Sequence, residues 1–380
     1  MGVVTFQKRC DGGRQIRHTH RMQSASIRKW VLALTLLAVI LWTIVHFYNL
    51  SAQKSGNLTR IVLEPLGASY RQTNLSITRP QMIPADSGSH KTLRQKVEEW
   101  LALHHHSANS LLAAFQVLND ANYLKEAATN FPDNPRVELT ILAHNTFPED
   151  RRKWLDLYKA SSPSNSLANY LSAQTCFQTG QSEAAVKDLV AATGKPDFDN
   201  YSLESQLDTE ELGLFCGESP LKSIEIARAG STADATLAII RQLASQMADL
   251  QKQELNVGDA DSAENLAQMG TILGDQLGSG ASGNYIVNQL AAITVESMML
   301  EPLNSNASYD FLGGETPGQR LHELRQQKTT LGKLAADFAA ANSNLTDAEK
   351  VNFQERVKIY GEVPAMRWVV QQHGDSPGSP

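Results

Sequence analysis

The sequence predicts an all-α protein: an N-terminal transmembrane helix, followed by a row of paired helices that continues into a helical bundle. Two observations predict this class. An apolar run without Asp, Glu, Lys or Arg extends from Trp30 to Tyr48, and about 20 helical residues suffice to cross the hydrocarbon core of a bilayer. From about residue 91 to 370, apolar residues then recur at helical spacing, without the clear period-2 alternation of strands.

The first 29 residues form a basic leader, with seven Lys or Arg residues against one acid, Asp11. Such a bias predicts that the N-terminus lies in the cytoplasm and that the bulk of the chain is extracytoplasmic. A cleaved signal peptide is the alternative, but its apolar core spans only about 7–15 residues. We therefore expect residues 30–48, bounded by Trp30 and Tyr48, to be an uncleaved signal anchor. A bacterial inner membrane, with the bulk facing the periplasm, is the preferred setting.

Two segments of the chain show little apolar periodicity. Residues 49–90 are rich in Ser, Thr, Asn, Gly and Pro, which predicts a flexible stalk, and the tail 373–380 is expected to be disordered.

The chain has a formal net charge of −6 although its leader is basic, so the remainder is acidic. Because phosphate binding needs clustered Lys and Arg, nucleic acid is not an expected partner. The expected partners are the lipid bilayer and other proteins.

Start and stop signals divide residues 91–372 into helices. Pro163, which follows two serines, indicates a helix entry. Thr346 and Glu349 have the spacing of a capping box, and glycines favour several helix ends. In chain order, the expected helices span residues 91–106, 108–118, 120–130, 135–145, 149–159, 164–178, 182–193, 203–215, 220–229, 232–254, 260–276, 284–300, 317–341, 346–360 and about 363–372.

A repeat is visible in residues 164–196, where two short alanine-rich helices meet at Gly180 and are followed by Pro196. Small side chains are needed where two helix backbones cross closely. This pattern resembles a tetratricopeptide unit, whose period is about 34 residues. Residues 121–135 and 221–230 are similar to parts of neighbouring units. The resemblance implies tetratricopeptide-like repeats over residues 91–231 and an extended surface that binds other proteins.

Residues 232–372 predict a helical bundle, because their helices are longer and show no clear repeat. Apolar residues recur at helical spacing on one face of residues 232–254. The run from Tyr285 to Leu303 is apolar enough for a central helix, but polar residues such as Glu296 interrupt it, so we expect no second membrane span. Near the C-terminus, Trp368 is expected to pack back onto the bundle.

Three cysteines are present, and Cys10 lies in the leader. Cys176 and Cys216 fall in the expected extracytoplasmic part, where an oxidising compartment would allow them to form a disulfide. The alternative is two separate buried thiols, because pairing requires Cα atoms within about 7 Å and the sequence does not give that distance. The chain has no CxxC motif, which argues against a redox dithiol and a zinc knuckle.

No catalytic, cofactor-binding or metal-binding residue is predicted, and no cofactor is expected. The consecutive histidines 104–106 would point in three directions about 100° apart on a helix, so they cannot all bind one metal ion. Ser219 and Lys222 match the SxxK spacing of penicillin-recognising enzymes but lack the other elements of that fold. The glycine-rich stretch 278–283 lacks the Lys-Ser/Thr of a phosphate loop and is expected to be a flexible connector.

The expected function is that of a membrane-anchored, extracytoplasmic helical-repeat protein, a non-catalytic scaffold or adaptor for other proteins. One alternative is an envelope enzyme, for example a peptidoglycan-cleaving or folding-assistance protein, with its site in residues 232–372. A second alternative is a structural subunit of a membrane complex. A deep pocket with convergent Glu, His or Ser in residues 232–372 would favour the enzyme, and a shallow groove would favour binding.

Overall fold

The computed structural model describes residues 91–230 and 232–373. Their regular structure is helical throughout, apart from an isolated bridge between Asn165 and Asp197, so the all-α prediction is confirmed for these residues. Within this part of the chain, no helix combines the length and the apolar character needed to cross a bilayer. The expected segments outside the described residues are the leader 1–29, the signal anchor 30–48 with its ends Trp30 and Tyr48, the stalk 49–90 and residues 374–380 of the tail. The first residue of the expected tail, His373, is the last residue of a helix.

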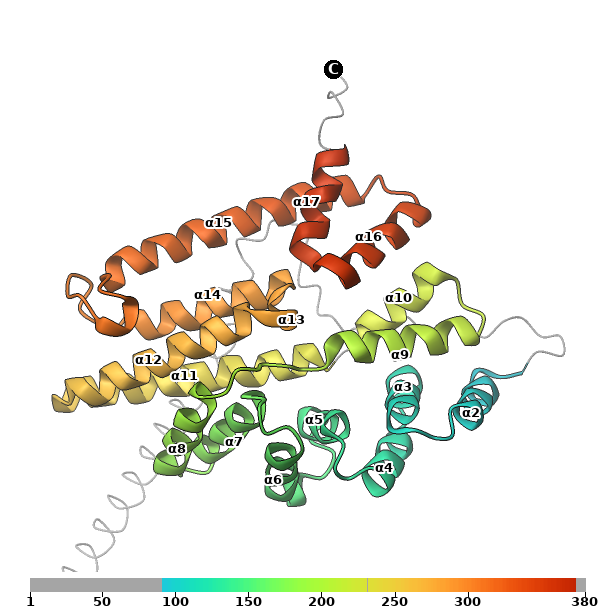
Figure 1. The fold of residues 1–380 in the computed structure, drawn as a ribbon, viewed down its shortest axis with the longest axis horizontal. Helices are drawn as coiled ribbons and strands as arrows, with labels where there is room; N and C mark the ends of the chain where they lie inside the picture. Colours follow the sequence, from blue (N-terminus) through green and yellow to red (C-terminus); the bar gives the residue numbers. More distant parts are fainter. Residues whose placement is uncertain (1–90, 231, 374–380) are drawn as a thin grey trace, which may run out of the picture. The chain divides into compact units, whose positions relative to one another are not determined.

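The described helices belong to one compact unit, Leu66–Pro380, and are drawn in Figure 1. In chain order they are α2 (Leu93–Leu103), α3 (Ala108–Leu118), α4 (Ala121–Asn130), α5 (Pro135–His144), η1 (Pro148–Asp150), α6 (Arg151–Ser161), α7 (Leu167–Gln178), α8 (Ser182–Thr193), α9 (Ser202–Phe215), α10 (Pro220–Ala229), α11 (Ala233–Val257), α12 (Ala260–Gly278), α13 (Gly280–Gly283), α14 (Ile286–Leu300), η2 (Asp310–Leu312), α15 (Pro317–Asn342), α16 (Asp347–Tyr360) and α17 (Glu362–His373).

Local capping explains why several helices begin where the sequence predicts. The capping box at α16 is present: the Thr346 hydroxyl accepts a hydrogen bond from the Glu349 N–H, and the Glu349 side chain accepts from the Thr346 N–H. Thr316 and Gln319 form the same arrangement at α15. Each box satisfies N–H groups that a helix start leaves without partners.

Two helices are shorter than expected for reasons that the backbone makes clear. The helix expected over residues 91–106 ends at Leu103, because His105 and His106 have φ angles of 54° and 47°, outside the right-handed helical region. The helix expected over 164–178 begins at Leu167. The residues just before Leu167 bond instead to the 197–199 segment, as in the bridge at Asn165.

Helices α3–α8 pack as successive pairs, α3 with α4, α5 with α6 and α7 with α8. The best-packed pair is the one in which the sequence repeat is clearest. Ala168 and Ala173 of α7 and Ala185 and Ala192 of α8 are all completely buried. Alanines at these positions let the two helices approach closely, as the sequence predicts.

One side of this row of pairs is covered by later helices of the same chain. Helix α9 packs against α3, and α11 packs against α7 and α5, so that α9 and α11 lie across the first helices of the three pairs (Figure 1). We call the side of α3, α5 and α7 that α9 and α11 contact the inner face. The inner face therefore contributes to the hydrophobic core.

The longer helices pack mainly through α12 and α14, and glycine allows the contact. Gly270, Gly274 and Gly278 recur every four residues on α12 and face α14. A Cβ atom added at Gly270 would lie 2.2 Å from Cγ of Met299, and one at Gly274 would lie 3.2 Å from the carbonyl oxygen of Ala292. A larger residue at either position would force its neighbour on α14 to shift, so glycine favours this close contact, as small residues do at other helix crossings.

Helices α16 and α17 close the C-terminal end of the described chain. The two helices pack against each other, and α17 also packs against α15. Met366 is buried, and Trp368 packs against the same apolar cluster as Phe338 of α15, as the sequence predicts. The guanidinium of Arg356 lies 4.0 Å from the centre of the Trp368 ring, a cation–π contact.

Candidate functional site

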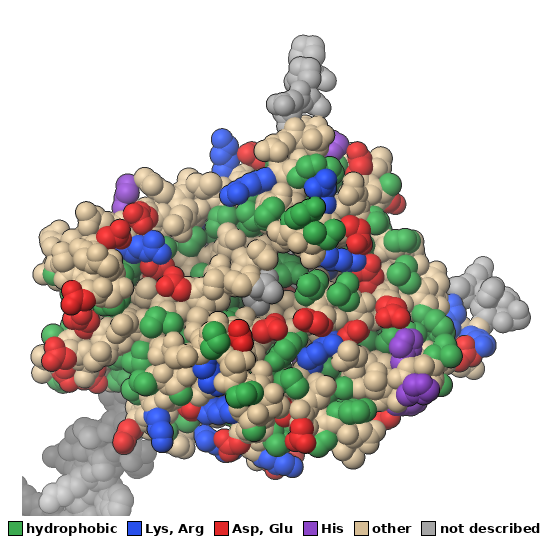
Figure 2. Space-filling model, viewed as in Figure 1, with side chains coloured by type: hydrophobic (Ala, Val, Ile, Leu, Met, Phe, Trp, Pro, Cys, Tyr) green, Lys and Arg blue, Asp and Glu red, His purple; other side chains and the backbone are tan. Residues whose placement is uncertain are grey.

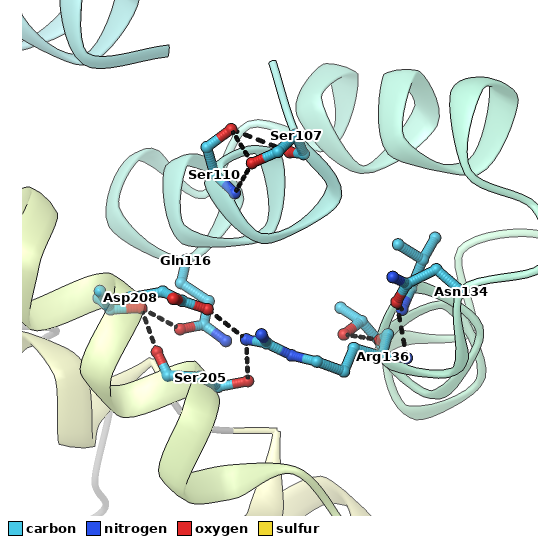
Figure 3. Close-up of polar contacts among 10 residues, drawn as sticks. Ser107, Ser110, Gln116, Asn134, Arg136, Ser205 and Asp208 are labelled. Atoms are coloured by element: carbon cyan, nitrogen blue, oxygen red, sulfur yellow. Dashed lines mark hydrogen bonds and ion pairs between the residues drawn. The ribbon is translucent and has the colours of Figure 1, made fainter. Parts of the chain in front are cut away.

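The repeat resemblance implied an extended surface for partners, and one side of the pairs, the inner face, is covered by the chain itself. Arg136 of α5 donates to a carboxylate oxygen of Asp208 on α9 at 2.6 Å, and the Thr209 hydroxyl donates to the side chain of Gln116 on α3, also at 2.6 Å. Figure 3 shows this set of contacts, which Ser205 joins. Arg136 and Gln116, two polar side chains that could have held a peptide, are therefore already bonded to α9.

A cleft between α12, α14, α15 and α17 is the candidate functional site. Its volume is about 880 Å³, within the range of small-ligand pockets. We call it the α15 cleft. The side chains that line it are those of Asp275, Ser279, Gln289, Ala292, Ile293, Glu296, Arg320, Glu323, Leu324, Gln326, Gln327, Thr330, Leu331 and Arg367, together with Gly274 and Gly278.

An ion pair between α14 and α15 forms the floor of the α15 cleft. Arg320 donates through Nε to one oxygen of Glu296 at 2.6 Å and through a terminal nitrogen to the other oxygen at 3.1 Å. Glu296 is only 4 % exposed. Burial raises the pKa of the Glu296 carboxyl, and the hydrogen bonds from Arg320 lower it. The same bonds raise the pKa of Arg320, so the pair is held in its charged form by two-point geometry.

The other charged side chains of the α15 cleft make fewer hydrogen bonds to described residues than Glu296 and Arg320 do. Glu323 accepts a hydrogen bond from Arg320 at 3.2 Å. Among the residues described, Asp275 and Arg367 take part in no ion pair. Partial burial raises the pKa of the Asp275 carboxyl, and the positive charge of Arg320 lowers it by a smaller amount. Figure 2 shows acidic side chains gathered at the end of the view where α15 begins.

A serine–lysine contact elsewhere resembles a nucleophile site but is closed to substrates. The ammonium group of Lys159 donates to the Ser172 hydroxyl at 2.9 Å, and this hydroxyl donates to Asp188 at 2.6 Å. Ser172 is completely buried between helices. A nucleophile must reach a substrate atom, so these residues act as a polar link between α6, α7 and α8.

The polar residues that the sequence analysis weighed have structural roles. His104 lies 3.4 Å from Glu211 and His106 lies 2.8 Å from Glu126. These two histidines therefore have different partners, although His105 and His106 lie outside the helix on which all three were expected. In the described part of the chain, no three His, Cys, Asp or Glu residues are grouped as metal ligands. The Ser219 hydroxyl caps α10 by accepting from the Lys222 N–H.

The glycine-rich connector and the cysteines are also accounted for. Residues 280–283 form the short helix α13 between α12 and α14, where a flexible connector was expected.

Cys176 and Cys216 are both buried free thiols, and burial raises the pKa of Cys216 to about 11. A disulfide between them in an oxidising compartment stays a prediction.

The sequence analysis missed the α15 cleft, although one signal for it was present. Glu296 is the one acid within the mostly apolar helix α14, and such a residue needs a partner when it is buried. Nothing in the sequence identified Arg320, 24 residues later, as that partner. No protein-family model, no curated protein and no solved structure matches this chain.

Proposed function

We propose that this chain is a membrane-anchored, extracytoplasmic scaffold or adaptor, non-catalytic, that holds a partner protein in the α15 cleft. In this proposal residues 30–48 span a bacterial inner membrane and the basic leader lies in the cytoplasm. Helices α3–α8 are tetratricopeptide-like pairs whose inner face is filled by α9 and α11. They act as a rigid support, and the partner is bound by the longer helices.

The observation that carries this proposal is the two-point pairing of Glu296 with Arg320. A general acid or base must give or accept a proton during a reaction, whereas both oxygens of Glu296 already accept hydrogen bonds from a guanidinium. Fixed charges of this kind orient a ligand. Besides the charged side chains of Asp275, Glu323 and Arg367, the remaining lining side chains are amides, hydroxyls and aliphatic groups. Such a mixture suits the peptide groups and side chains of another protein.

A second candidate function is an envelope enzyme, and one observation favours it. Asp275 and Glu296 line the same cleft, and burial raises the pKa of each. Paired carboxyl groups with raised pKa values are typical of acid–base sites. In this alternative Asp275, which has no ion-pair partner among the described residues, would be the proton-transferring group.

Crosslinking from within the cleft tests the proposal. A photoreactive amino acid at Gln327, which lines the cleft, should capture a defined partner protein from intact cells that express the full chain. The matched control carries the same group at Gln253, an exposed residue of α11 away from the cleft. Capture at Gln253 equal to that at Gln327, or no capture at either position, would contradict the proposal.

The enzyme alternative has its own readout. If the purified full chain hydrolyses envelope polymers such as peptidoglycan, and Asp275→Asn abolishes the activity while Asp261→Asn does not, the enzyme replaces the scaffold as the function. Asp261 is exposed on the same helix and lies outside the cleft, so it controls for the loss of a charge from α12.

A further inference from the structure

We infer that the α15 cleft binds a short, extended peptide along α15, with a cationic group of the peptide at Asp275 and its terminal carboxylate at Arg367. This inference rests on the proposed function and specifies the chemistry of the bound segment. Three features support it: the length of the cleft, the surplus of negative charge at one end and the unpaired cation at the other.

The cleft is long enough for several residues. Its lining residues on α15 run from Arg320 to Leu331, eleven positions apart, which corresponds to about 16 Å along a helix. An extended chain rises about 3.3 Å per residue, so about five residues fit. Helix α17 packs on the later part of α15, where Met366 and Trp368 share a cluster with Leu334 and Phe338, which places Arg367 toward the Leu331 end.

The end near Arg320 has more negative charge than its own cation neutralises. Arg320 donates to Glu296 twice and to Glu323 once. Asp275 is close enough for the charge of Arg320 to affect its pKa, but the two form no ion pair. Three carboxylates therefore surround one guanidinium. A ligand that brings an ammonium or guanidinium group beside Asp275 would restore the balance in a site partly removed from water.

The opposite end carries a cation without an acid. Arg367 is exposed, lines the cleft and takes part in no ion pair among the described residues. A guanidinium binds a carboxylate through two parallel hydrogen bonds, so a terminal carboxylate is its natural ligand. Between the two ends, Gln327 and Thr330 offer donors and acceptors to peptide groups, and Ile293 and Leu324 provide apolar surface.

The absence of aromatic side chains argues for a peptide over a sugar. No Phe, Tyr or Trp is among the residues that line the α15 cleft. Ring-shaped ligands are commonly held against aromatic faces, whereas an extended chain needs hydrogen bonds along its length and complementary charge at its ends.

Calorimetric titration of the detergent-solubilised full chain tests the inference. The probe is the synthetic peptide Lys-Ala-Ala-Ala-Ala with a free carboxyl terminus. It is compared with the same peptide amidated at that terminus, and with a version that has an acetylated amino terminus and norleucine in place of lysine. We expect removal of either charge to weaken binding about tenfold or more.

Variants assign each end of the peptide to a residue. Arg367→Ala should bind the free and amidated peptides with equal affinity, because the group that senses the carboxylate is gone. Asp275→Asn should bind the lysine and norleucine peptides with equal affinity. The controls Arg325→Ala, on an exposed part of α15 outside the cleft, and Asp261→Asn should discriminate as the unsubstituted chain does. Thermal unfolding by circular dichroism checks that every variant folds.

The outcomes separate this inference from the proposed function. If no peptide binds up to millimolar concentration, or all three bind equally, the inference is overturned. Partner capture at Gln327 in that case would leave the scaffold proposal standing. If the peptides bind with the expected discrimination and Gln327 captures no protein, the inference holds and the scaffold proposal fails.

Discussion

The two regions of the described chain each bury a glutamate, and they neutralise it differently. Glu138 in the paired helices is completely buried, and its Oε2 accepts a hydrogen bond from the Ser161 hydroxyl while Oε1 has no partner. Glu296 in the longer helices has both oxygens bonded to Arg320. Burial raises the pKa of Glu138 to about 7. The paired helices therefore accommodate a carboxyl group by favouring its neutral form, and the longer helices by supplying a cation.

The two glutamates also differ in what lies beside them. An uncharged glutamate can be enclosed completely, and Glu138 of α5 is; α9 and α11 pack against the inner face of α3, α5 and α7. A charged pair is less costly when part of it reaches water. The Arg320 side chain is 26 % exposed, and its position at the α15 cleft leaves a polar floor that a ligand can contact.

The largest expected effect comes from removing the cation of the longer helices. Arg320→Met should lower the free energy of unfolding by about 3–4 kcal/mol at pH 7, because Glu296 stays buried without its partner. Denaturant unfolding measures the change. In the double variant Glu296→Gln with Arg320→Met most of the stability should return. A single variant as stable as the unsubstituted chain would show that the ion pair is not needed.

A slightly smaller effect on the free energy of unfolding, one that depends on pH, is expected from Glu138 in the paired helices. The folded chain keeps the Glu138 proton up to about pH 7, whereas the unfolded chain releases it near the ordinary pKa of 4.5. Stability should therefore fall as pH rises from about 4.5 to 7 and change no further from this group above pH 7. Glu138→Gln should lack this fall and be more stable by about 2–3 kcal/mol at pH 8.

Unfolding curves of Glu138→Gln and the unsubstituted chain at pH 5 and pH 8 test this prediction. The two proteins should differ little at pH 5 and most at pH 8. A constant difference at both pH values would mean that Glu138 is charged in the folded chain, as Glu296 is, and the contrast between the two regions would disappear.

The smallest effects on stability are expected when alanine replaces either of two glycines in the longer helices. Gly270→Ala should destabilise the chain by about 1–2 kcal/mol, because the new Cβ would overlap Met299. Gly332→Ala in α15 meets nothing within 4 Å and should stabilise the chain by about 0.5–1 kcal/mol through helix propensity. Melting temperatures of the two variants should shift in opposite directions. Shifts of the same sign would contradict the close α12–α14 contact.

The sequence predicted the helices well because their signals are local. Caps such as Thr346, prolines at helix starts and apolar periodicity all act within a few residues. One error occurred where distant residues decide: residues 164–166 leave the helix to bond with the 197–199 segment. The other is local, since the backbone leaves the helical region at His105 and His106. The three glycines of α12 at four-residue spacing were a local signal for close packing that the sequence analysis did not use.

The candidate site was less predictable because its parts are far apart in the chain. Glu296 and Arg320 come from different helices, and Arg367 comes from a third. Spacing in one sequence cannot show that such residues meet, in contrast to motifs whose members lie on one helix or loop. The packing of α9 and α11 on the inner face could not be predicted for the same reason. The ion pair between Arg136 and Asp208, for example, joins residues 72 positions apart.

The covering of α3, α5 and α7 by α9 and α11 also limits how such a chain can change in evolution. Open repeat arrays gain or lose units freely, because each unit depends only on its neighbours. Here an inserted pair would extend the row beyond its cover and expose apolar surface, unless α9 or α11 grew by a matching length. Duplication and elongation would have to occur together, so the number of pairs is expected to be constant among descendants of this gene while their loops vary.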